Sequence, residues 1–342
     1  MFSRKTGFIR LMTGLATLGL AGLSIGPVIA QAPATEPAAI AELPVKMVTG
    51  GLLSAVEAYF SPDGKWLIMQ ARKDTTEVNY HTYMVSLDGK EIRQINDKGT
   101  DACSYFFPDG KRIIWTSTRD NLQAAEGNFA APDDYPTGSE LYVSDLNGKN
   151  VKRVTTNAYY DAEVSVSPDG QSVLFGRRKD GNMELWRMKT DGTEEVQITN
   201  TPDLQEGGAF YLADSKTIIY RAWNKADDGK RGIPMTIYTI QHDGTGLKQI
   251  TTDPGTNWAP HPSPDGKHFV YVRVVGQGNY EIFLMNLETG QKTQVTNHPS
   301  FDGYPAFSPD GKTISFASSR DVPRGQRRFY IHTMDISSLM KK

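Results

Sequence analysis

The side chains that could do chemistry in this sequence recur at fixed distances from a repeated turn. The tripeptide Pro-Asp-Gly occurs at 62–64, 108–110, 168–170, 264–266 and 309–311, with a degenerate copy, Ala-Asp-Ser, at 213–215. Eight residues before the turn aspartates stand, in chain order, Ala55, Asp101, Asp161, Glu206, Asn257 and Asp302. Two positions further along, Glu57 and Glu163 are expected to point the same way, because alternate residues of a strand share a face.

This mostly acidic column has two interpretations. If the repeats close around an axis, the column forms a ring at one mouth of a channel, where it would attract a basic peptide, a sugar or a divalent cation. Ca²⁺ is the cofactor that such a ring suits, since oxygen ligands hold it in proteins. In the other interpretation, the short polar side chains bond to backbone amides and lock neighbouring repeats together. The sequence leaves both open.

A second column, four residues before each turn aspartate, is rich in aromatic side chains. It consists of Tyr59, Tyr105, Ser165, Phe210, His261 and Ala306. Rings in a channel can stack on a peptide or a sugar, or they can simply fill a narrow bore. His261, with Asn257 and Trp258 close by in the chain, is the most suggestive local cluster. The ligand-binding candidates at the channel mouth are therefore Tyr59, Tyr105, Asp101, Asp161, Glu163, Glu206, Asn257, Trp258, His261 and Asp302.

Catalytic motifs are sparse. The histidines show no His-x-x-x-His spacing of the kind that binds zinc. A Gly-x-Ser-x-Gly pattern at 22–26 lies in an apolar leader without the strand and helix that a nucleophile elbow needs. The sequence therefore predicts no catalytic residue and names no metal ligand.

The repeats themselves predict the fold that positions these columns. Successive turn aspartates are 46, 60, 45, 51 and 45 residues apart, a period typical of propeller blades. Each repeat contains apolar segments such as 66–70 and 83–86, separated by polar stretches and by Gly-containing dipeptides that favour tight hairpins. The sequence predicts an all-β, six-bladed propeller of four-stranded blades.

The last blade needs a strand from elsewhere in the chain. After 330–334 the sixth repeat has no clear fourth strand, whereas Val45–Thr49 matches the fourth-strand segment Val151–Thr155. We expect the N-terminal segment to complete the last blade, which would close the ring and remove exposed edges.

The repeat resembles the PD40, or WD40-like, unit of the TolB-like propeller family over about 45–336. The resemblance rests on the five Pro-Asp-Gly turns, the Arg-Asp pairs at 119–120 and 320–321, the Ile-Thr strand endings, and the serines Ser61, Ser167, Ser263 and Ser308. It covers only the propeller part, since the α/β domain of the family's namesake has no counterpart in this sequence. The resemblance implies a propeller that docks an envelope lipoprotein and accepts an extended peptide at the channel mouth, but it identifies no individual contact residue.

The N-terminal region predicts export. Residues 1–32 have a basic start, an apolar core at 11–25 and small residues at 30–32, the pattern of a signal peptide. Residues 33–44, rich in Pro and Ala, predict a linker, and 45–342 the propeller. No second apolar run is long enough to cross a bilayer, so we expect a periplasmic chain without an integral membrane segment. The single cysteine, Cys103, has no partner for an intramolecular disulfide, and we expect it to serve in packing.

The net charge and the loop lengths limit the classes of function that we expect. A formal net charge of −2, from 37 basic and 39 acidic residues, gives no electrostatic footprint for nucleic acid. Long loops at 118–139 and 223–234 should share the face of the channel mouth, and such loops commonly carry binding sites. We expect a monomeric, noncatalytic module that binds an envelope protein or peptide, or alternatively a glycan.

The alternative function is a polysaccharide lyase or hydrolase that uses the mouth carboxylates, His261 and a divalent ion. The two functions make different structural predictions. An enzyme predicts histidine and carboxylate side chains with shifted pKa values in one pocket. A binding module predicts an exposed aromatic patch on the loop-bearing face, formed by Phe129, Tyr135, Trp223 and Trp258.

Overall fold

The structure is a computed structural model that describes residues 42–122, 135–230, 232–276, 278–323 and 325–340. The proposed signal peptide, most of the proposed linker and Phe129 lie outside these residues. No helix in the described ranges has the length and apolar composition needed to cross a bilayer.

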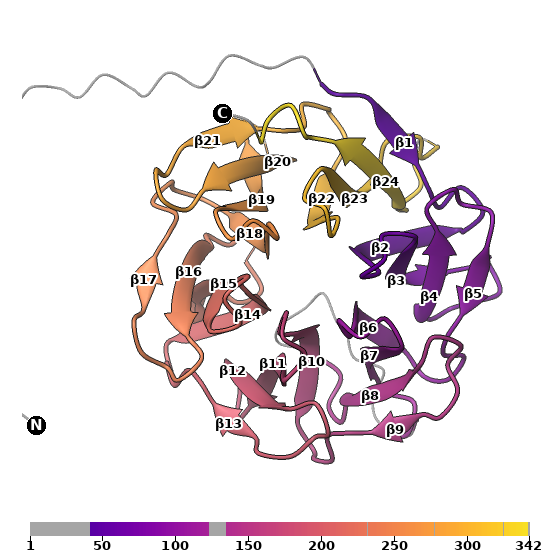
Figure 1. Cartoon of the computed structure of the whole chain (residues 1–342), viewed down its shortest axis with the longest axis vertical. Helices are drawn as coiled ribbons and strands as arrows, with labels where there is room; N and C mark the ends of the chain where they lie inside the picture. Colours follow the sequence, from indigo (N-terminus) through magenta and orange to yellow (C-terminus); the bar gives the residue numbers. More distant parts are fainter. Residues whose placement is uncertain (1–41, 123–134, 231, 277, 324, 341–342) are drawn as a thin grey trace, which may run out of the picture. The chain divides into compact units, whose positions relative to one another are not determined.

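Six antiparallel four-stranded sheets are arranged as blades in a ring (Figure 1), which confirms the predicted all-β propeller. Blade 1 holds β2 (Ser54–Phe60), β3 (Trp66–Arg72), β4 (His81–Ser86) and β5 (Ile92–Gln94). Blade 2 holds β6 (Asp101–Phe106), β7 (Arg112–Ser117), β8 (Glu140–Asp145) and β9 (Lys152–Arg153). Blade 3 holds β10 (Tyr160–Val166), β11 (Ser172–Lys179), β12 (Asn182–Lys189) and β13 (Val196–Gln197).

The second half of the ring repeats this plan. Blade 4 holds β14 (Leu204–Tyr211), β15 (Thr217–Asn224), β16 (Thr236–Gln241) and β17 (Lys248–Gln249), with a short 3-10 helix, η1 (Lys225–Asp227), after β15. Blade 5 holds β18 (Asn257–Pro262), β19 (His268–Val275), β20 (Asn279–Asn286) and β21 (Lys292–Gln294). Blade 6 holds β22 (Asp302–Phe307), β23 (Thr313–Ser318), β24 (Tyr330–Asp335) and β1 (Val45–Met47).

The fourth position of blade 6 is occupied by the N-terminal strand. β1 pairs antiparallel with β24, with Val45 opposite Met334 and Met47 opposite His332. In Figure 1 the indigo β1 runs beside the yellow β24. Blade 6 thus contains strands from both ends of the described chain.

One side-chain contact explains why the segment at 45–49 fits there. In four other blades the threonine after the fourth strand accepts a hydrogen bond from the backbone N–H of the third strand: Thr155 from Leu141, Thr199 from Leu185, Thr251 from Ile237 and Thr296 from Ile282, at 2.9 to 3.0 Å. Thr49 accepts the same bond from Ile331 at 2.8 Å. The match between 45–49 and 151–155 in sequence is therefore a match in hydrogen bonding.

The recurring turns are stabilised by local bonds. At the first turn the Ser61 hydroxyl donates to Asp63 at 2.6 Å, and Asp63 accepts from the Lys65 backbone N–H at 3.1 Å. Gly64 has φ of 68°, the left-handed region that favours glycine. The serine that precedes the proline and the aspartate that follows it therefore stabilise the turn.

Every innermost strand contains a β-bulge, where the pairing register with the second strand shifts. The residue six positions before each turn aspartate has a positive φ of 31° to 55°: Glu57, Cys103, Glu163, Gly208, Ala259 and Tyr304. The bulge changes the direction of the side chains that follow it. It therefore determines which residues face the axis.

Candidate functional site

A cavity of about 580 Å³ lies at the channel mouth on the loop-bearing face. All six bulge residues line it, together with side chains from the loops after the second strands, such as Tyr80, Tyr135 and Phe329. Val78, at its rim, is 79% exposed, so the cavity is accessible from solvent. We call this cavity the axial pocket.

Aromatic side chains dominate the walls of the axial pocket. They are Tyr80, Tyr135, Tyr160, Trp223, Trp258, Tyr304 and Phe329. Tyr135 stacks on Tyr160 with ring centroids 4.4 Å apart, and Trp258 meets Tyr304 edge-on at 4.6 Å. A concave site with apolar walls and a few convergent polar groups is the usual form of a ligand-binding site.

The floor of the pocket is closed by an aromatic cluster. Tyr59, Tyr105, Phe210 and His261 contact one another with ring centroids 4.8 to 6.0 Å apart. Burial lowers the pKa of His261 to about 3, so this imidazole is neutral at physiological pH. The second column of the sequence therefore plugs the channel, and only Tyr59 and Phe210 of that column line the pocket.

Two carboxylates and one guanidinium enter the pocket just above this floor. Arg221 of β15 forms a bidentate pair with Glu163 of β10, at 2.7 and 3.3 Å, and the Gly208 backbone N–H donates to the same carboxylate. Gly208 leaves space for the guanidinium, because a Cβ atom there would lie 2.1 Å from its Nη1. Blades 3 and 4 are thus joined by an ion pair inside the pocket.

Glu57 is the second carboxylate, and it has a different environment. It accepts a hydrogen bond from the Tyr59 hydroxyl at 3.1 Å. Burial and, less strongly, the nearby Glu163 charge raise the pKa of Glu57 to about 7, although the hydrogen bond with the Cys103 thiol opposes this shift. Burial also raises the pKa of Cys103. At neutral pH a substantial fraction of Glu57 is therefore protonated.

The acidic column lies mainly between the blades instead of at the mouth. Asp101 accepts bonds from the Thr82 backbone N–H and hydroxyl, at 2.7 and 2.9 Å, and from Asn96 at 2.7 Å, which ties blade 2 to blade 1. The Asn257 amide donates to the Met235 carbonyl of the preceding blade at 3.1 Å. These contacts match the interpretation in which polar side chains lock neighbouring repeats.

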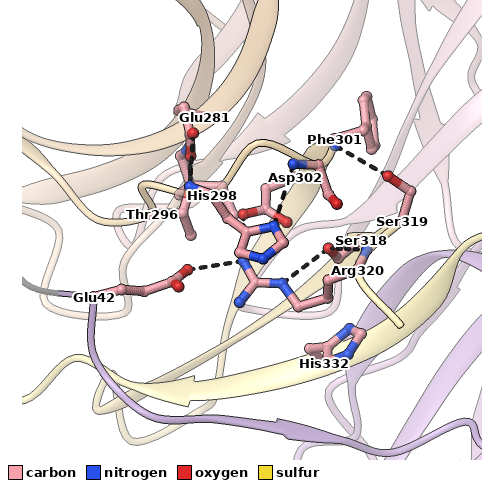
Figure 2. A network of polar contacts seen from close by, with 12 residues as sticks. Glu42, Glu281, Thr296, His298, Phe301, Asp302, Ser318, Ser319, Arg320 and His332 are labelled. Carbon is pink, nitrogen blue, oxygen red and sulfur yellow. Dashed lines mark hydrogen bonds and ion pairs between the residues drawn. The ribbon is translucent and has the colours of Figure 1, made fainter. Parts of the chain in front are cut away.

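Two members of the column form buried ion pairs. Asp161 is bound by Arg177 through two bonds of 2.7 Å. Asp302 is bound by Arg320, which also reaches Glu42 at 2.8 Å (Figure 2). Glu206 accepts from Thr201 at 3.0 Å, and burial raises its pKa to about 7.

The structure thus divides the candidate residues. Tyr59, Asp101, Glu163 and Trp258 line the axial pocket, whereas Tyr105, Asp161, Glu206, Asn257, His261 and Asp302 are not among its lining residues. A bulge separates each acidic-column position from the residue two further along, and in blade 3 Glu163 lines the pocket whereas Asp161 does not. Of the expected exposed patch, Tyr135 and Trp223 are buried and line the pocket wall.

Sequence reasoning missed Arg221, Tyr160 and Tyr304 as pocket residues. For Tyr304 the available signal was the column six residues before each turn aspartate, which also contains Glu57 and Glu163, whereas Tyr160 lies outside that column. Arg221 gives no such signal, since its side chain enters from the second strand of its blade.

Across the described ranges, no three His, Cys, Asp or Glu side chains are grouped so that they could hold a metal ion. We therefore name no residue as a ligand for Ca²⁺ or another cation.

The comparisons with known proteins agree with this architecture. The model of the PD40 family, described as the TolB beta propeller domain, matches residues 232–341. The Tol-Pal system protein TolB of Alcanivorax borkumensis is 30% identical over 125 residues, which are 36% of this chain and 26% of that protein. The chain is a six-bladed propeller whose repeats are similar to those of the TolB-like PD40 family.

Other similar proteins extend over more of this propeller. An uncharacterized protein of Agrobacterium fabrum is 26% identical over 274 residues, which are 75% of this chain and 82% of that protein. The solved structure of an oligogalacturonate lyase in complex with manganese has a TM-score of 0.57 and 17% identity, covering 83% of this chain and 78% of the lyase. At that identity the lyase shares the fold, which by itself carries no activity.

Proposed function

We propose that this TolB-like propeller is an exported, noncatalytic binding module whose axial pocket receives a side chain of an extended segment from an envelope protein. The observation that carries the proposal is the axial pocket itself, an aromatic cavity of about 580 Å³ at the mouth of a plugged channel. Its relative in the Tol-Pal system supports an envelope partner. Aromatic side chains in a preformed concavity are typical anchors for a partner's side chain.

Pocket filling tests the proposal. Ala259 has the same bulge position and nearly the same φ as Tyr304, 49° against 52°, so Ala259→Tyr places a ring in the pocket without a new backbone conformation. A photo-cross-linking residue at Val78 on the rim should give a discrete adduct with a protein of the envelope fraction. That adduct should disappear in the Ala259→Tyr background.

The control cross-linker stands at Leu247, which is 59% exposed and does not line the pocket. An adduct at Val78 that survives Ala259→Tyr, or that forms equally from Leu247, would contradict the proposal. Export is tested separately: N-terminal sequencing of protein from the periplasmic fraction should show loss of residues 1–32, and an intact N-terminus in the cytoplasm would contradict it.

The second candidate function is a polysaccharide lyase or hydrolase, a class that includes a protein of the same fold. One observation in the pocket favours it. The Glu57 carboxyl, with a pKa of about 7, is suited to proton transfer near neutral pH. An activity assay on a panel of uronate-containing oligosaccharides, with and without Mn²⁺ and Ca²⁺, distinguishes the two functions. Turnover that Glu57→Gln abolishes would contradict the binding-module proposal and support the enzyme.

A further inference from the structure

The charges of the axial pocket are unequal. Among its described lining residues Glu57, Asp101 and Glu163 are acidic, and Arg221 is the one basic residue. Arg221 is already engaged by Glu163 at 2.7 Å. Asp101 is satisfied by hydrogen bonds from Thr82 and Asn96. Glu57 is therefore the carboxylate left to meet a ligand.

Glu57 lacks a counter-ion within the described protein. Among the described residues no ion pair includes Glu57, and its carboxylate accepts hydrogen bonds from two neutral groups, the Tyr59 hydroxyl at 3.1 Å and the Cys103 thiol. The ionisable groups that face it are Cys103 of β6, Tyr160 and Glu163 of β10, Arg221 of β15, Tyr304 of β22 and Tyr59 of its own strand. A carboxyl group held in an apolar cavity without a cation favours a ligand that brings one.

The walls suit the same ligand. Trp258 and Tyr304, and the stacked Tyr135 and Tyr160, surround the space above Glu57 with aromatic rings. The face of an aromatic ring attracts a cation, and the attraction is stronger when the cation has lost its water. The ring surfaces also bury an alkyl stem. The pocket thus combines an unpaired acid with aromatic walls.

We propose that the axial pocket selects a primary ammonium group on an apolar stem, such as a lysine side chain of the partner segment, with Glu57 as its counter-ion. This inference rests on the proposed function, because it names the kind of side chain that the pocket receives. The ammonium donates to the Glu57 carboxylate while its alkyl stem packs against the aromatic walls. Binding ionises the protonated fraction of Glu57, so it releases a proton near neutral pH.

The test uses the chain without residues 1–32 and simple amines. The protein is titrated with n-hexylammonium, with its uncharged counterpart n-hexanol and with hexanoate, and the fluorescence of Trp223 and Trp258 in the pocket reports binding. We expect hexylammonium to bind at least about tenfold more tightly than hexanol, and hexanoate to bind most weakly. Hexylammonium affinity should also rise from pH 6 to pH 8, a range in which an alkylamine, with a pKa near 10, stays charged.

Glu57→Gln should lower hexylammonium affinity about tenfold, leave hexanol affinity unchanged and remove the pH dependence. Glu288→Gln, at an exposed position outside the pocket, is the matched control and should change none of these. Equal binding of hexanol and hexylammonium, or an unchanged affinity in Glu57→Gln, would overturn the inference. The comparison of ammonium with alcohol on the unmodified protein stands even if Glu57→Gln fails to fold.

The source of the ammonium group is tested with Nα-acetyl-lysine methylamide and its Nε-acetyl form. Preference for the former over both its acetylated form and hexylammonium supports a lysine in a protein segment, and preference for hexylammonium supports a free amine. If Ala259→Tyr abolishes the Val78 adduct but hexylammonium binds no more tightly than hexanol, the proposed function is supported and the ammonium inference is wrong. If hexylammonium is preferred but no adduct forms at Val78, the ammonium inference is supported and the proposal of an envelope protein partner is wrong.

Discussion

The six bulge residues show how one backbone position serves different purposes in different blades. Glu57, Cys103 and Glu163 bring polar groups to the axis, whereas Gly208 provides space for the Arg221 guanidinium. Tyr304 contributes a ring to the wall. Because a propeller repeats its backbone more closely than its sequence, the same position carries five different residue types in the six blades and gives a composite site.

Gly208→Ala should break the pair that joins blades 3 and 4. The new methyl group would overlap the Arg221 guanidinium, and φ of 55° is unfavourable for alanine. Gly229→Ala is the matched control, since Gly229 also has a positive φ, 73°, but has nothing within 4 Å of the added atom. We expect Gly208→Ala to lower the free energy of unfolding by about 2 kcal/mol more than Gly229→Ala in urea titrations. Equal losses would mean that the ion pair contributes nothing.

The Cys103 thiol should resist alkylation. It is buried at the bulge of β6, and burial raises its pKa, so little of the reactive thiolate forms at pH 8. Mass spectrometry after treatment with iodoacetamide should find the native protein unmodified over a time in which the urea-unfolded chain is fully alkylated. Equal rates in the two states would contradict the burial of this side chain.

At the scale of the strands, the threonine that follows the fourth strand in five of the six blades provides a direct test of the strand supplied by 45–49. Thr49→Val removes the acceptor for the Ile331 N–H, and Thr155→Val removes the equivalent acceptor for Leu141. A buried N–H left without a partner costs about 1 to 3 kcal/mol. We therefore expect similar decreases in unfolding free energy for both variants. If only Thr155→Val destabilises the protein, β1 does not stabilise blade 6.

The sequence predicted the strands better than the directions of their side chains. Turn spacing and hairpin dipeptides gave six blades, because a tight turn with positive φ depends on the residues within it. The bulges depend on how the innermost strands converge at the axis, which the local sequence does not encode. For that reason Asp161 was expected at the mouth but lies paired with Arg177, while Arg221 was not expected there at all.

At the scale of the whole molecule, the ring places buried carboxyl groups both at its axis and between its blades. Burial raises the pKa of Glu57, Glu206 and Glu281 to about 7 and that of Asp101 to about 6. In the unfolded chain these groups titrate near pH 4. Between these values the native protein binds more protons than the unfolded chain, so its stability decreases as the pH rises.

Two histidines act in the opposite direction over part of this range. Burial lowers the pKa of His261 to about 3 and also lowers that of His332, so below about pH 6.5 the unfolded chain takes up these protons and stability decreases as the pH falls. Above pH 6.5 the unfolded histidines lose most of their remaining charge within about one pH unit, so their opposing effect fades. The carboxyl groups therefore dominate the pH dependence between pH 6.5 and pH 8.

We expect the urea midpoint of unfolding to decrease steadily from pH 6.5 to pH 8, because the buried glutamates lose their protons in the native protein over this interval. Glu281→Gln removes one of these groups at the network between blades 5 and 6 (Figure 2) and should flatten the decrease. Glu288→Gln, at an exposed position, should leave the slope unchanged. A midpoint that is constant or rises over this interval would mean that these carboxyl groups are ionised in the native ring at neutral pH, with cations or water in place of protons.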